Sequence, residues 1–251
     1  MAIAITRAVP STFDQATMEV AASVDLALAR IQHAAYVSAL RSLGLTAVEL
    51  PADDRFPDCC FVEDCAVIAD GVGLITRPGA ASRRGETAAV EAALASNIGI
   101  ERIAHMVAPA TLDGGDCLRI GRQLYVGLSA RTNAAGVARL REVFSNLTIV
   151  PVPLENVLHL KCHCSALGDD RVLLAEGTIA PEVFAGLHVV TIPNAERYAA
   201  NCLAHAGTAL VSDGFAETRA TLERAGFATI ALSMSEMRKA DGSLTCLSLL
   251  F

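Results

Sequence analysis

The sequence has no excess of basic residues. Its 251 residues contain 20 lysines and arginines against 27 aspartates and glutamates, which gives a formal net charge of −7. A protein that binds nucleic acid or an anionic membrane gathers positive charge on one face to meet the phosphates. We therefore expect no nucleic acid and no membrane among the main partners, and a small cationic substrate suits the acidic balance better.

Long apolar runs are missing as well. No uncharged stretch reaches the ~18 residues needed to cross a bilayer as a helix, and the N-terminal stretch lacks a basic segment followed by an apolar core. The cysteines lie mostly inside apolar runs, which is typical of reduced thiols. We expect a cytoplasmic protein with free cysteines at eight positions: 59, 60, 65, 117, 162, 164, 202 and 246.

No stretch rich in glycine, proline or serine divides the chain, and none is low in complexity. With 53% hydrophobic and 19% charged residues the chain can bury a substantial core. We therefore assign residues 1–251 to a single domain.

Strand-like and helix-like segments alternate along the whole chain. Val24, Leu28, Ile31 and Ala35 are spaced like one face of a helix that Gly44 can end, and the strand-like TAVEL follows. Further helices are expected over 82–94 and 137–144, briefly from Pro181, and up to residue 226. A unit of strand, strand, helix and strand recurs about every 40–55 residues, as in radial repeat folds.

Two strand-like runs are left over, AIAITRA near the N-terminus and SLTCLSLLF at the C-terminus. Pairing them would close the repeats without leaving a long sheet edge exposed. We predict an α/β propeller of five such units in a closed ring; the alternative is an open mixed sheet with helices outside.

Cys246 is the most informative single residue. Taken alone, a cysteine in an apolar run is usually a packing residue. Elsewhere, however, the chain has a histidine in LHLK, an acidic pair in FVED, and arginines in TRPGAASRRGE and GLSARTN. A thiol, an acid–base histidine and carboxylates together suit attack on a cationic carbon.

Several longer motifs resemble one family, the dimethylarginine dimethylaminohydrolases, and they follow that family's order along essentially the whole chain. They are FPDCCFVEDCAV, ITRPGAASRRGE, ATLDGGD, YVGLSARTN, LHLK, AANC and SMSEMRKADGSLTC. The resemblance implies the pentein fold, a five-fold pseudosymmetric α/β propeller. It also implies hydrolysis of Nω-methylated arginine to citrulline and dimethylamine or methylamine.

The resemblance assigns catalytic roles to three residues. Cys246 would attack the guanidinium carbon as a thiolate and form a covalent alkylthiouronium. His159 would act as acid and base, with Asp113 beside it, and an aspartate in that place favours the imidazolium. Because an ordinary thiol is only a few per cent ionised at neutral pH, the bound cation or a nearby imidazolium has to favour the thiolate.

The resemblance places eight further residues at the substrate. Asp64 would meet the guanidinium, with Asp58 and Glu63 nearby. Arg83 and Arg131 would hold the α-carboxylate, since a guanidinium can bind a carboxylate with two bonds. Asp241 would lie at the substrate amine. Ala240 stands where the family has valine, and Phe13 stands where it has leucine, at the end of a lid over residues 7–13.

Ordinary structural roles are the alternatives for these residues. Asp58 and Asp113 fit turns, the arginines fit surface salt bridges, Asp241 fits an Asp-Gly turn, and His159 fits a core position. No cofactor and no catalytic metal are expected; an inhibitory zinc on Cys246 and His159 is compatible with the resemblance. A homodimer is left open.

Two other function classes stay open at this point. A deiminase acting on unmethylated arginine would use the same nucleophile, although such enzymes are longer and often have a helical insertion. A non-enzymatic pentein of the ribosome-binding type would keep the ring without the chemistry. The presence of Cys246, His159 and the acidic residues argues against the second.

Overall fold

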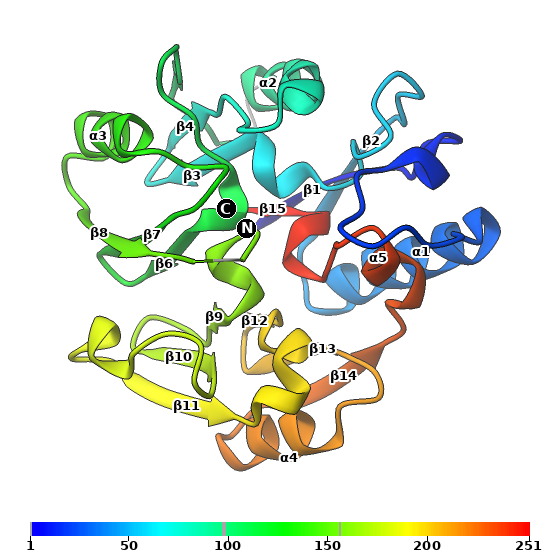
Figure 1. The fold of residues 1–251 in the computed structure, drawn as a ribbon, viewed down its shortest axis with the longest axis vertical. Helices are drawn as coiled ribbons and strands as arrows, with labels where there is room; N and C mark the ends of the chain where they lie inside the picture. Colours follow the sequence, from blue (N-terminus) through cyan, green and yellow to red (C-terminus); the bar gives the residue numbers. More distant parts are fainter. Residues whose placement is uncertain (1, 97–98, 156) are drawn as a thin grey trace.

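A computed structural model describes residues 2–96, 99–155 and 157–251. Within them, fifteen strands form five sheets of three strands each, arranged around a common centre (Figure 1). The sheets, in strand order, are β15 (Leu249–Leu250), β1 (Ile3–Arg7) and β2 (Thr46–Leu50); β3 (Ala66–Ala69), β4 (Val72–Ile75) and β5 (Arg102–His105); β6 (Cys117–Ile120), β7 (Gln123–Leu128) and β8 (Thr148–Pro153); β9 (Cys164–Ala166), β10 (Arg171–Ala175) and β11 (His188–Ile192); β12 (Leu203–His205), β13 (Thr208–Ser212) and β14 (Ala228–Leu232).

All five sheets have the same topology. In each sheet the middle strand pairs antiparallel with one neighbour, which we call the inner strand, and parallel with the other, the outer strand. The inner strands are β15, β3, β6, β9 and β12. A parallel pair needs a crossover, and a helical segment lies between the middle and outer strands of each sheet. These segments are α1 (Leu26–Ser42), α2 (Thr87–Ala95), α3 (Ala134–Val143), η6 (Pro181–Phe184) and α4 (Ala216–Arg224). The predicted repeat of strand, strand, helix and strand is confirmed.

The first sheet is built from both ends of the chain. β1 pairs antiparallel with β15, with Ile5 opposite Leu249, and Ile3 and Phe251 exchange two backbone hydrogen bonds of 2.7 and 3.0 Å. The two leftover segments therefore pair as predicted. Inner strands of all five sheets line one central cavity of about 220 Å³. The observed architecture is the predicted five-unit α/β propeller, and the open mixed sheet is ruled out.

A short 3-10 turn precedes each inner strand, and we call these five segments the inner turns. They are η2 (Val62–Cys65), η4 (Gly114–Asp116), η5 (Leu160–Cys162), η7 (Asn194–Ala200) and η8 (Thr245–Leu247). Cys246 and His159 were expected on strands, but Cys246 lies in η8 and His159 at the start of η5. In these turns, side chains accept backbone hydrogen bonds that a neighbouring strand would accept in a sheet. The backbone N–H of Leu160, for example, donates to the carboxylate of Asp116.

The helices differ from prediction in several details. α1 is present, but its buried face contains Ala29, Gln32, Tyr36 and Leu40, so Leu28, Ile31 and Ala35 face outward. The spacing of apolar residues predicted the wrong buried face because Gln32 is polar and yet buried. Its amide donates hydrogen bonds to Ser233 and Ser235, at the start of α5 (Ser235–Lys239).

Two predicted helices are shorter than expected. α2 begins at Thr87, after the 3-10 turn η3 (Ala81–Glu86), and the segment opened by Pro181 is a single 3-10 turn. None of the helices in the described ranges is long and apolar enough to cross a membrane.

Apolar side chains pack between each sheet and its helical segment. Leu140 on α3, for example, is fully buried in the cluster that also contains Leu124 and Ile149 from the adjoining strands. Truncating such a leucine to alanine costs about 2–5 kcal/mol. The outer layer therefore supports the sheets, and the polar inner turns can meet at the centre.

Candidate active site

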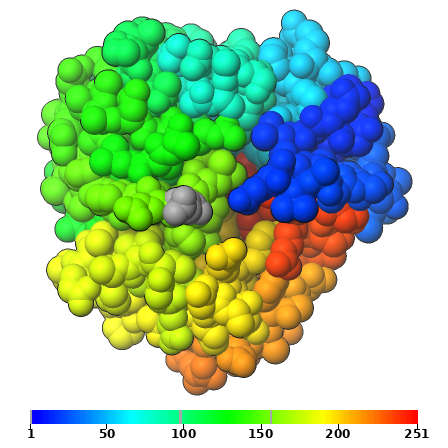
Figure 2. All heavy atoms as spheres, viewed as in Figure 1, coloured from blue at the N-terminus to red at the C-terminus, as the bar shows by residue number. Residues whose placement is uncertain are grey.

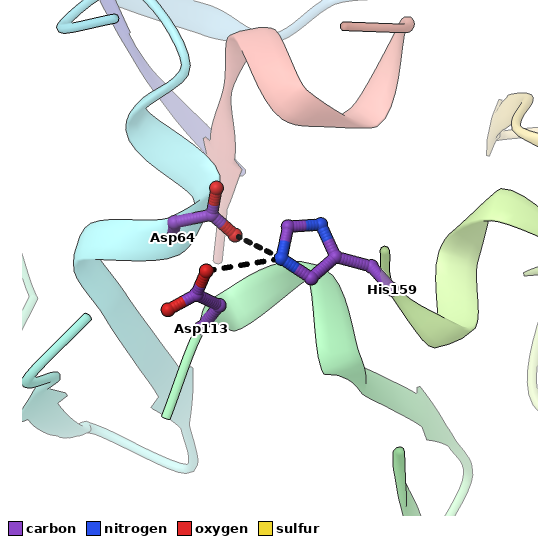
Figure 3. A group of neighbouring side chains, drawn as sticks. All are labelled: Asp64, Asp113 and His159. Carbon is purple, nitrogen blue, oxygen red and sulfur yellow. Dashed lines mark hydrogen bonds and ion pairs between the residues drawn. The ribbon is translucent and has the colours of Figure 1, made fainter. Parts of the chain in front are cut away.

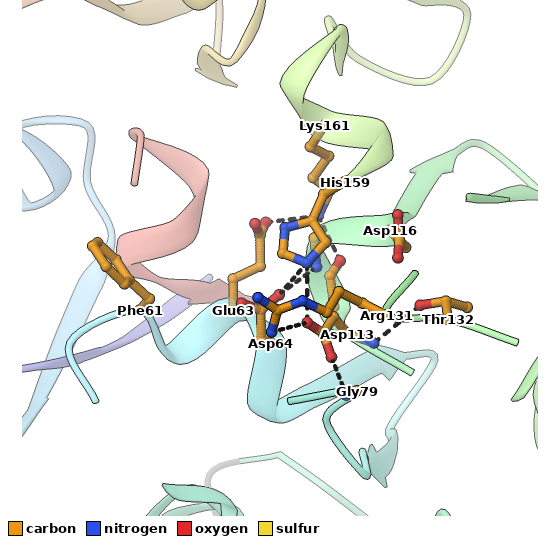
Figure 4. A network of polar contacts seen from close by, with 12 residues as sticks. Phe61, Glu63, Asp64, Gly79, Asp113, Asp116, Arg131, Thr132, His159 and Lys161 are labelled. Carbon is orange, nitrogen blue, oxygen red and sulfur yellow. Dashed lines mark hydrogen bonds and ion pairs between the residues drawn. The ribbon is translucent and has the colours of Figure 1, made fainter. Parts of the chain in front are cut away.

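The inner turns lie next to one another, and Figure 4 shows polar side chains from η2, η4 and η5 gathered in one network. η2 contacts both η8 and η4, η4 contacts η5, and η5 contacts η7. Five of the predicted site residues lie on or directly before these turns: Glu63 and Asp64 on η2, Asp113 before η4, His159 before η5, and Cys246 on η8. The fold thus brings together residues that are far apart in the chain, as the bond between Glu63 and Thr245, 182 positions apart, illustrates.

His159 faces two carboxylates with one ring nitrogen (Figure 3). Its Nε2 lies 3.0 Å from Oδ2 of Asp113 and 3.9 Å from Oδ1 of Asp64, and all three side chains are buried. Burial alone would lower the pKa of His159, but the charge of Asp64 and the hydrogen bond to Asp113 outweigh it and raise this pKa to about 9. His159 is therefore an imidazolium at neutral pH.

Asp64 is the matching anion. Burial would raise its pKa, but the charges of His159 and Arg83 and the donated N–H of Gly115 lower the pKa to about 2. Gly115 N lies 2.8 Å from Oδ1 of Asp64, so the LDGGD turn also orients the FVED carboxylate. The two motifs therefore form one electrostatic unit.

The two glycines of LDGGD allow this close packing. A Cβ on Gly115 would lie 2.7 Å from Nδ1 of His159 and 3.1 Å from Asp64. A Cβ on Gly114 would overlap the carbonyl oxygen of Glu63. Any larger residue would push η4 away from η2 and from the imidazole.

Asp113 is held from the opposite side. Its Oδ1 accepts from the N–H of Gly79 at 2.8 Å, and its own N–H donates to Oγ1 of Thr132. Arg131 reaches Oδ2 with a longer approach of 3.9 Å and keeps 19% of its side chain exposed. Arg131 therefore lies at the rim of the site, where its guanidinium can still donate N–H hydrogen bonds to a ligand.

Arg83 is different, because it is buried and already paired. It binds Asp64 at 2.5 Å and Glu86 at 2.8 Å, and it donates to the carbonyl oxygen of Phe61. Burial would raise the pKa of Glu86, Arg83 opposes this, and the balance is a pKa of about 7. A role for Arg83 as a clamp on the substrate carboxylate stays a prediction and requires one of these bonds to be exchanged.

Glu63 is part of the floor of the site. It binds Nζ of Lys161 at 2.6 Å through one oxygen and accepts from Oγ1 of Thr245 at 2.8 Å through the other. Glu63, Lys161 and Thr245 also line the central cavity. They therefore lie between the turns that bear the predicted catalytic residues and the space enclosed by the inner strands.

Cys246 is half-buried, directly after Thr245. Burial and the negative charges of Glu63 and Asp64 raise its pKa well above the ordinary value for a thiol, and the backbone of Ser243 opposes them. The raised pKa keeps the thiol of Cys246 protonated at neutral pH. A cation placed beside these carboxylates would remove much of the penalty on the thiolate.

A segment near the N-terminus covers the site through two of the predicted substrate carboxylates. Asp58 accepts from the N–H of Thr17 at 3.1 Å, and Asp241 accepts from the N–H of Glu19 at 2.5 Å. In Figure 2 the blue N-terminal segment lies across the centre beside the red C-terminal residues. The covering residues thus lie beyond the predicted range of 7–13.

Phe13 and Ala240 are both buried. Phe13 packs edge-on against Phe61, with ring centroids 5.8 Å apart. Both residues belong to the apolar cluster against which Cys246 packs. They form the apolar surroundings of the thiol, and direct contact with a substrate stays a prediction.

Three polar residues near the site were not predicted: Asp116 and Asn201, which are buried, and Lys161, which is half-buried. Asp116 accepts from Ser129 Oγ at 2.6 Å and from the N–H of Leu160, so it braces the turn that begins at His159. Lys161 pairs with Glu63, and Asn201 bonds the cysteine turn. All three lie inside quoted motifs (LDGGD, LHLK and AANC), which was the only signal the sequence offered.

One group of described side chains has the spacing of metal ligands. The nearest oxygens of Asp64 and Asp113 and a nitrogen of His159 all lie within 4.8 Å of one another. A metal there would have to displace the proton that the raised pKa of His159 holds on the ring. The group does not include Cys246, so a zinc on Cys246 and His159 stays a prediction.

Comparison with known proteins agrees with this geometry. The family model described as N,N dimethylarginine dimethylhydrolase, eukaryotic, matches residues 4–247. The chain belongs to this family.

Two of the relatives are bacterial dimethylarginine dimethylaminohydrolases. The chain is 41% identical to the enzyme of Streptomyces coelicolor over 228 residues, which cover 90% of this chain and 86% of the relative. It is 37% identical to the enzyme of Pseudomonas aeruginosa over 229 residues, which cover 90% of each chain. The resemblance inferred from the motifs is confirmed.

Solved structures of dimethylarginine dimethylaminohydrolase share the whole fold. A cysteine-to-serine mutant of the Pseudomonas aeruginosa enzyme, complexed with citrulline, superposes with a TM-score of 0.93 at 36% identity and covers 99% of this chain and 98% of that chain. The N-terminal domain of the cyanobacterial arginine dihydrolase ArgZ reaches a TM-score of 0.91 at 15% identity and covers 100% of this chain and 98% of that one. The second likeness shows the shared pentein fold alone.

Proposed function

We propose that this chain hydrolyses Nω-methylated L-arginine to L-citrulline, releasing dimethylamine from asymmetric dimethylarginine and methylamine from monomethylarginine. The observation that carries the proposal is the group of inner turns, in which the protonated His159 faces the ionised Asp64 and the turn of Asp64 contacts the turn of Cys246. Relatives with the same fold support it: one is complexed with citrulline, and a histidine-to-glycine variant forms an adduct with S-methyl-L-thiocitrulline.

The charges of the site suit a guanidinium at one end of the substrate and an amino acid at the other. The guanidinium would lie against Asp64, with Glu63 behind it, because the negative charges of these two carboxylates act on Cys246 and would attract a cation to the thiol. Arg131 would take the α-carboxylate from the rim. Asp58 and Asp241 would take the α-amine close to the covering segment.

The first half of the reaction forms a covalent intermediate. Binding of the cation favours the thiolate, and Sγ of Cys246 bonds the guanidinium carbon to give a neutral tetrahedral adduct. His159 then donates its proton to the methylated nitrogen, the C–N bond breaks, and dimethylamine leaves. A cationic alkylthiouronium and a neutral imidazole remain.

The second half uses water. Neutral His159 takes a proton from a water molecule while the oxygen bonds the same carbon. The C–S bond then breaks, the remaining hydroxyl proton is lost as the C=O bond forms, and citrulline is released with Cys246 again a thiolate. That proton passes to the released amine through solvent, so the net change is cationic substrate plus water to citrulline plus the protonated amine, and His159 ends protonated as it began.

A substrate panel tests the proposal. Citrulline release is measured from monomethylarginine, asymmetric and symmetric dimethylarginine, and arginine, each over a range of concentrations. We expect kcat/KM for monomethylarginine or asymmetric dimethylarginine to exceed that for arginine by about tenfold or more. Preference for arginine would instead indicate a deiminase. If none of the four compounds were turned over, the interpretation as a non-enzymatic pentein would be favoured.

We also propose that the enzyme acts in the cytoplasm. All eight cysteines are free, including the half-buried Cys162 and Cys246. A nucleophilic thiol needs surroundings that keep it reduced.

A further inference from the structure

The five inner turns occupy equivalent places in the five repeats, and four of them bear residues of the proposed site. η2 contains Asp64, η4 follows Asp113, η5 follows His159, and η8 contains Cys246. The fifth turn, η7, is followed directly by Asn201, which has no part in the chemistry described above. Its position in the repeat makes it the remaining candidate for a function at the centre.

Asn201 is 5% exposed, and its amide makes three hydrogen bonds to segments outside its own turn. Nδ2 donates to the carbonyl oxygen of Lys161 and to Oγ1 of Thr245, each at 3.1 Å, and Oδ1 accepts from the N–H of Thr245 at 2.9 Å. Lys161 lies two residues after His159, and Thr245 directly precedes Cys246. One side chain therefore joins the histidine turn to the cysteine turn.

These bonds complete a closed circuit of four residues. Oγ1 of Thr245 donates to Glu63, and Nζ of Lys161 donates to the other oxygen of Glu63. η7 also holds the start of the cysteine loop, because the hydroxyl of Tyr198 donates to the carbonyl oxygen of Gly242 at 2.9 Å. An asparagine that merely stabilised its own turn would direct its amide to the local backbone.

We propose that Asn201 is a positioning residue that sets the distance between the sulfur of Cys246 and the imidazole of His159. The inference rests on the proposed function, in which His159 must protonate the amine that Cys246 displaces. Both groups must therefore meet one carbon and one nitrogen of the same guanidinium. A displacement of about 1 Å costs on the order of 100-fold in rate in such arrangements.

Gln32 provides a matched control. Its buried amide also donates two hydrogen bonds, to Ser233 and Ser235, and accepts one, from the N–H of Glu236, but it joins α1 to the start of α5. We expect Asn201→Ala and Gln32→Ala to lower the melting temperature by similar amounts. Asn201→Ala alone should lower kcat, by about 10- to 100-fold with little change in KM.

A second measurement needs no substrate. Alkylation of Cys246 by iodoacetamide is followed by peptide mass spectrometry as a function of pH. In Asn201→Ala the pH midpoint should fall toward that of an ordinary thiol, because the sulfur moves away from Glu63 and Asp64; in Gln32→Ala it should match the wild type. If the wild type turned over no methylarginine, the proposed function would fail while this readout still decided the role of Asn201.

Thr245 tests the same link from its other end, should Asn201→Ala not fold. Thr245→Val keeps the shape and removes the hydroxyl, whereas Thr245→Ser keeps the hydroxyl. We expect the valine variant to reproduce the loss of kcat and the serine variant to restore it. The proposal is overturned if Asn201→Ala loses no more kcat than Gln32→Ala, or if Thr245→Val and Thr245→Ser behave alike.

Discussion

Asp113 and His159 belong to neighbouring repeats, and their side chains meet with Oδ2 3.0 Å from Nε2. The aspartate is fully buried and is itself held by the N–H of Gly79. The contact therefore fixes one face of the imidazole and helps to keep it protonated. Its removal should be visible in the pH dependence of the reaction.

Asp113→Asn should move the alkaline limb of the kcat profile to lower pH. The pKa of His159 is about 9 in part because of this carboxylate, so a neutral amide lowers that pKa and the imidazolium is lost earlier as pH rises. The measurement is kcat for asymmetric dimethylarginine from pH 6 to 10. Asp170→Asn, at an exposed carboxylate paired with Arg171, is the control and should leave the limb in place.

Folding stability should also depend on His159 above neutral pH. Its folded pKa of about 9 lies above the unfolded value of about 6.5, so its contribution is full below pH 6.5 and is lost as pH rises through 9. The loss is at most about 3 kcal/mol, because the interaction is shared with Asp64. Urea unfolding at pH 6.5 and 9.5 measures it, and a His159→Asn variant with an equally large decrease would contradict the assignment.

Cys246→Ser and His159→Ala should each lower citrulline formation by at least about 10³-fold while the fold is retained. The serine hydroxyl is a far weaker nucleophile, and without His159 the leaving amine receives no proton. Circular dichroism verifies the fold. Cys162→Ser is the control, since Cys162 is the other half-buried thiol, and near wild-type turnover in either site variant would refute the roles.

Arg131 and Arg83 should respond differently to replacement by lysine. Arg131 is partly exposed at the rim, so Arg131→Lys should raise KM by about tenfold and leave the melting temperature nearly unchanged. The guanidinium of Arg83 pairs with two buried carboxylates, Asp64 and Glu86, which a single ammonium group cannot bind in the same way. Arg83→Lys should therefore lower the melting temperature clearly. If both variants raised KM alone, both arginines would be carboxylate clamps.

Gly115→Ala should lower kcat by about 100-fold, because the added carbon would lie 2.7 Å from Nδ1 of His159 and push the ring away from Asp113. Gly73→Ala adds a carbon at ordinary contact distance, 3.4 Å from Leu94, and serves as the control. Equal activity of the two variants would show that η4 can move without consequence for His159.

The sequence predicted the parts of the fold that depend on local pattern. Apolar runs marked the strands, and the two unpaired runs at the ends indicated how the ring closes. It failed where buried polar groups decide the outcome. Gln32 lies on the buried face of α1 because partners about 200 residues away accept its hydrogen bonds, and no local periodicity reports such a contact.

The same reason limits prediction of the site. Cys246 and His159 were identified by type and motif, but their place on turns depends on side chains of other repeats that take up the backbone N–H groups. Asp116 binds the N–H of Leu160, and Asn201 binds that of Thr245. Each partner lies more than 40 residues away, so only the folded chain shows which polar residues brace the catalytic ones.

The pairing of β1 with β15 links catalysis to the completion of folding. Joining the two ends demands the largest loop closure in the chain, so this contact is expected to form late. The thiol lies on the turn that leads directly into β15. A partly folded chain, or one still being synthesised, would therefore hold its carboxylates and imidazole in place without the proposed nucleophile among them, and turnover of the proposed substrate would mark the molecules that have finished folding.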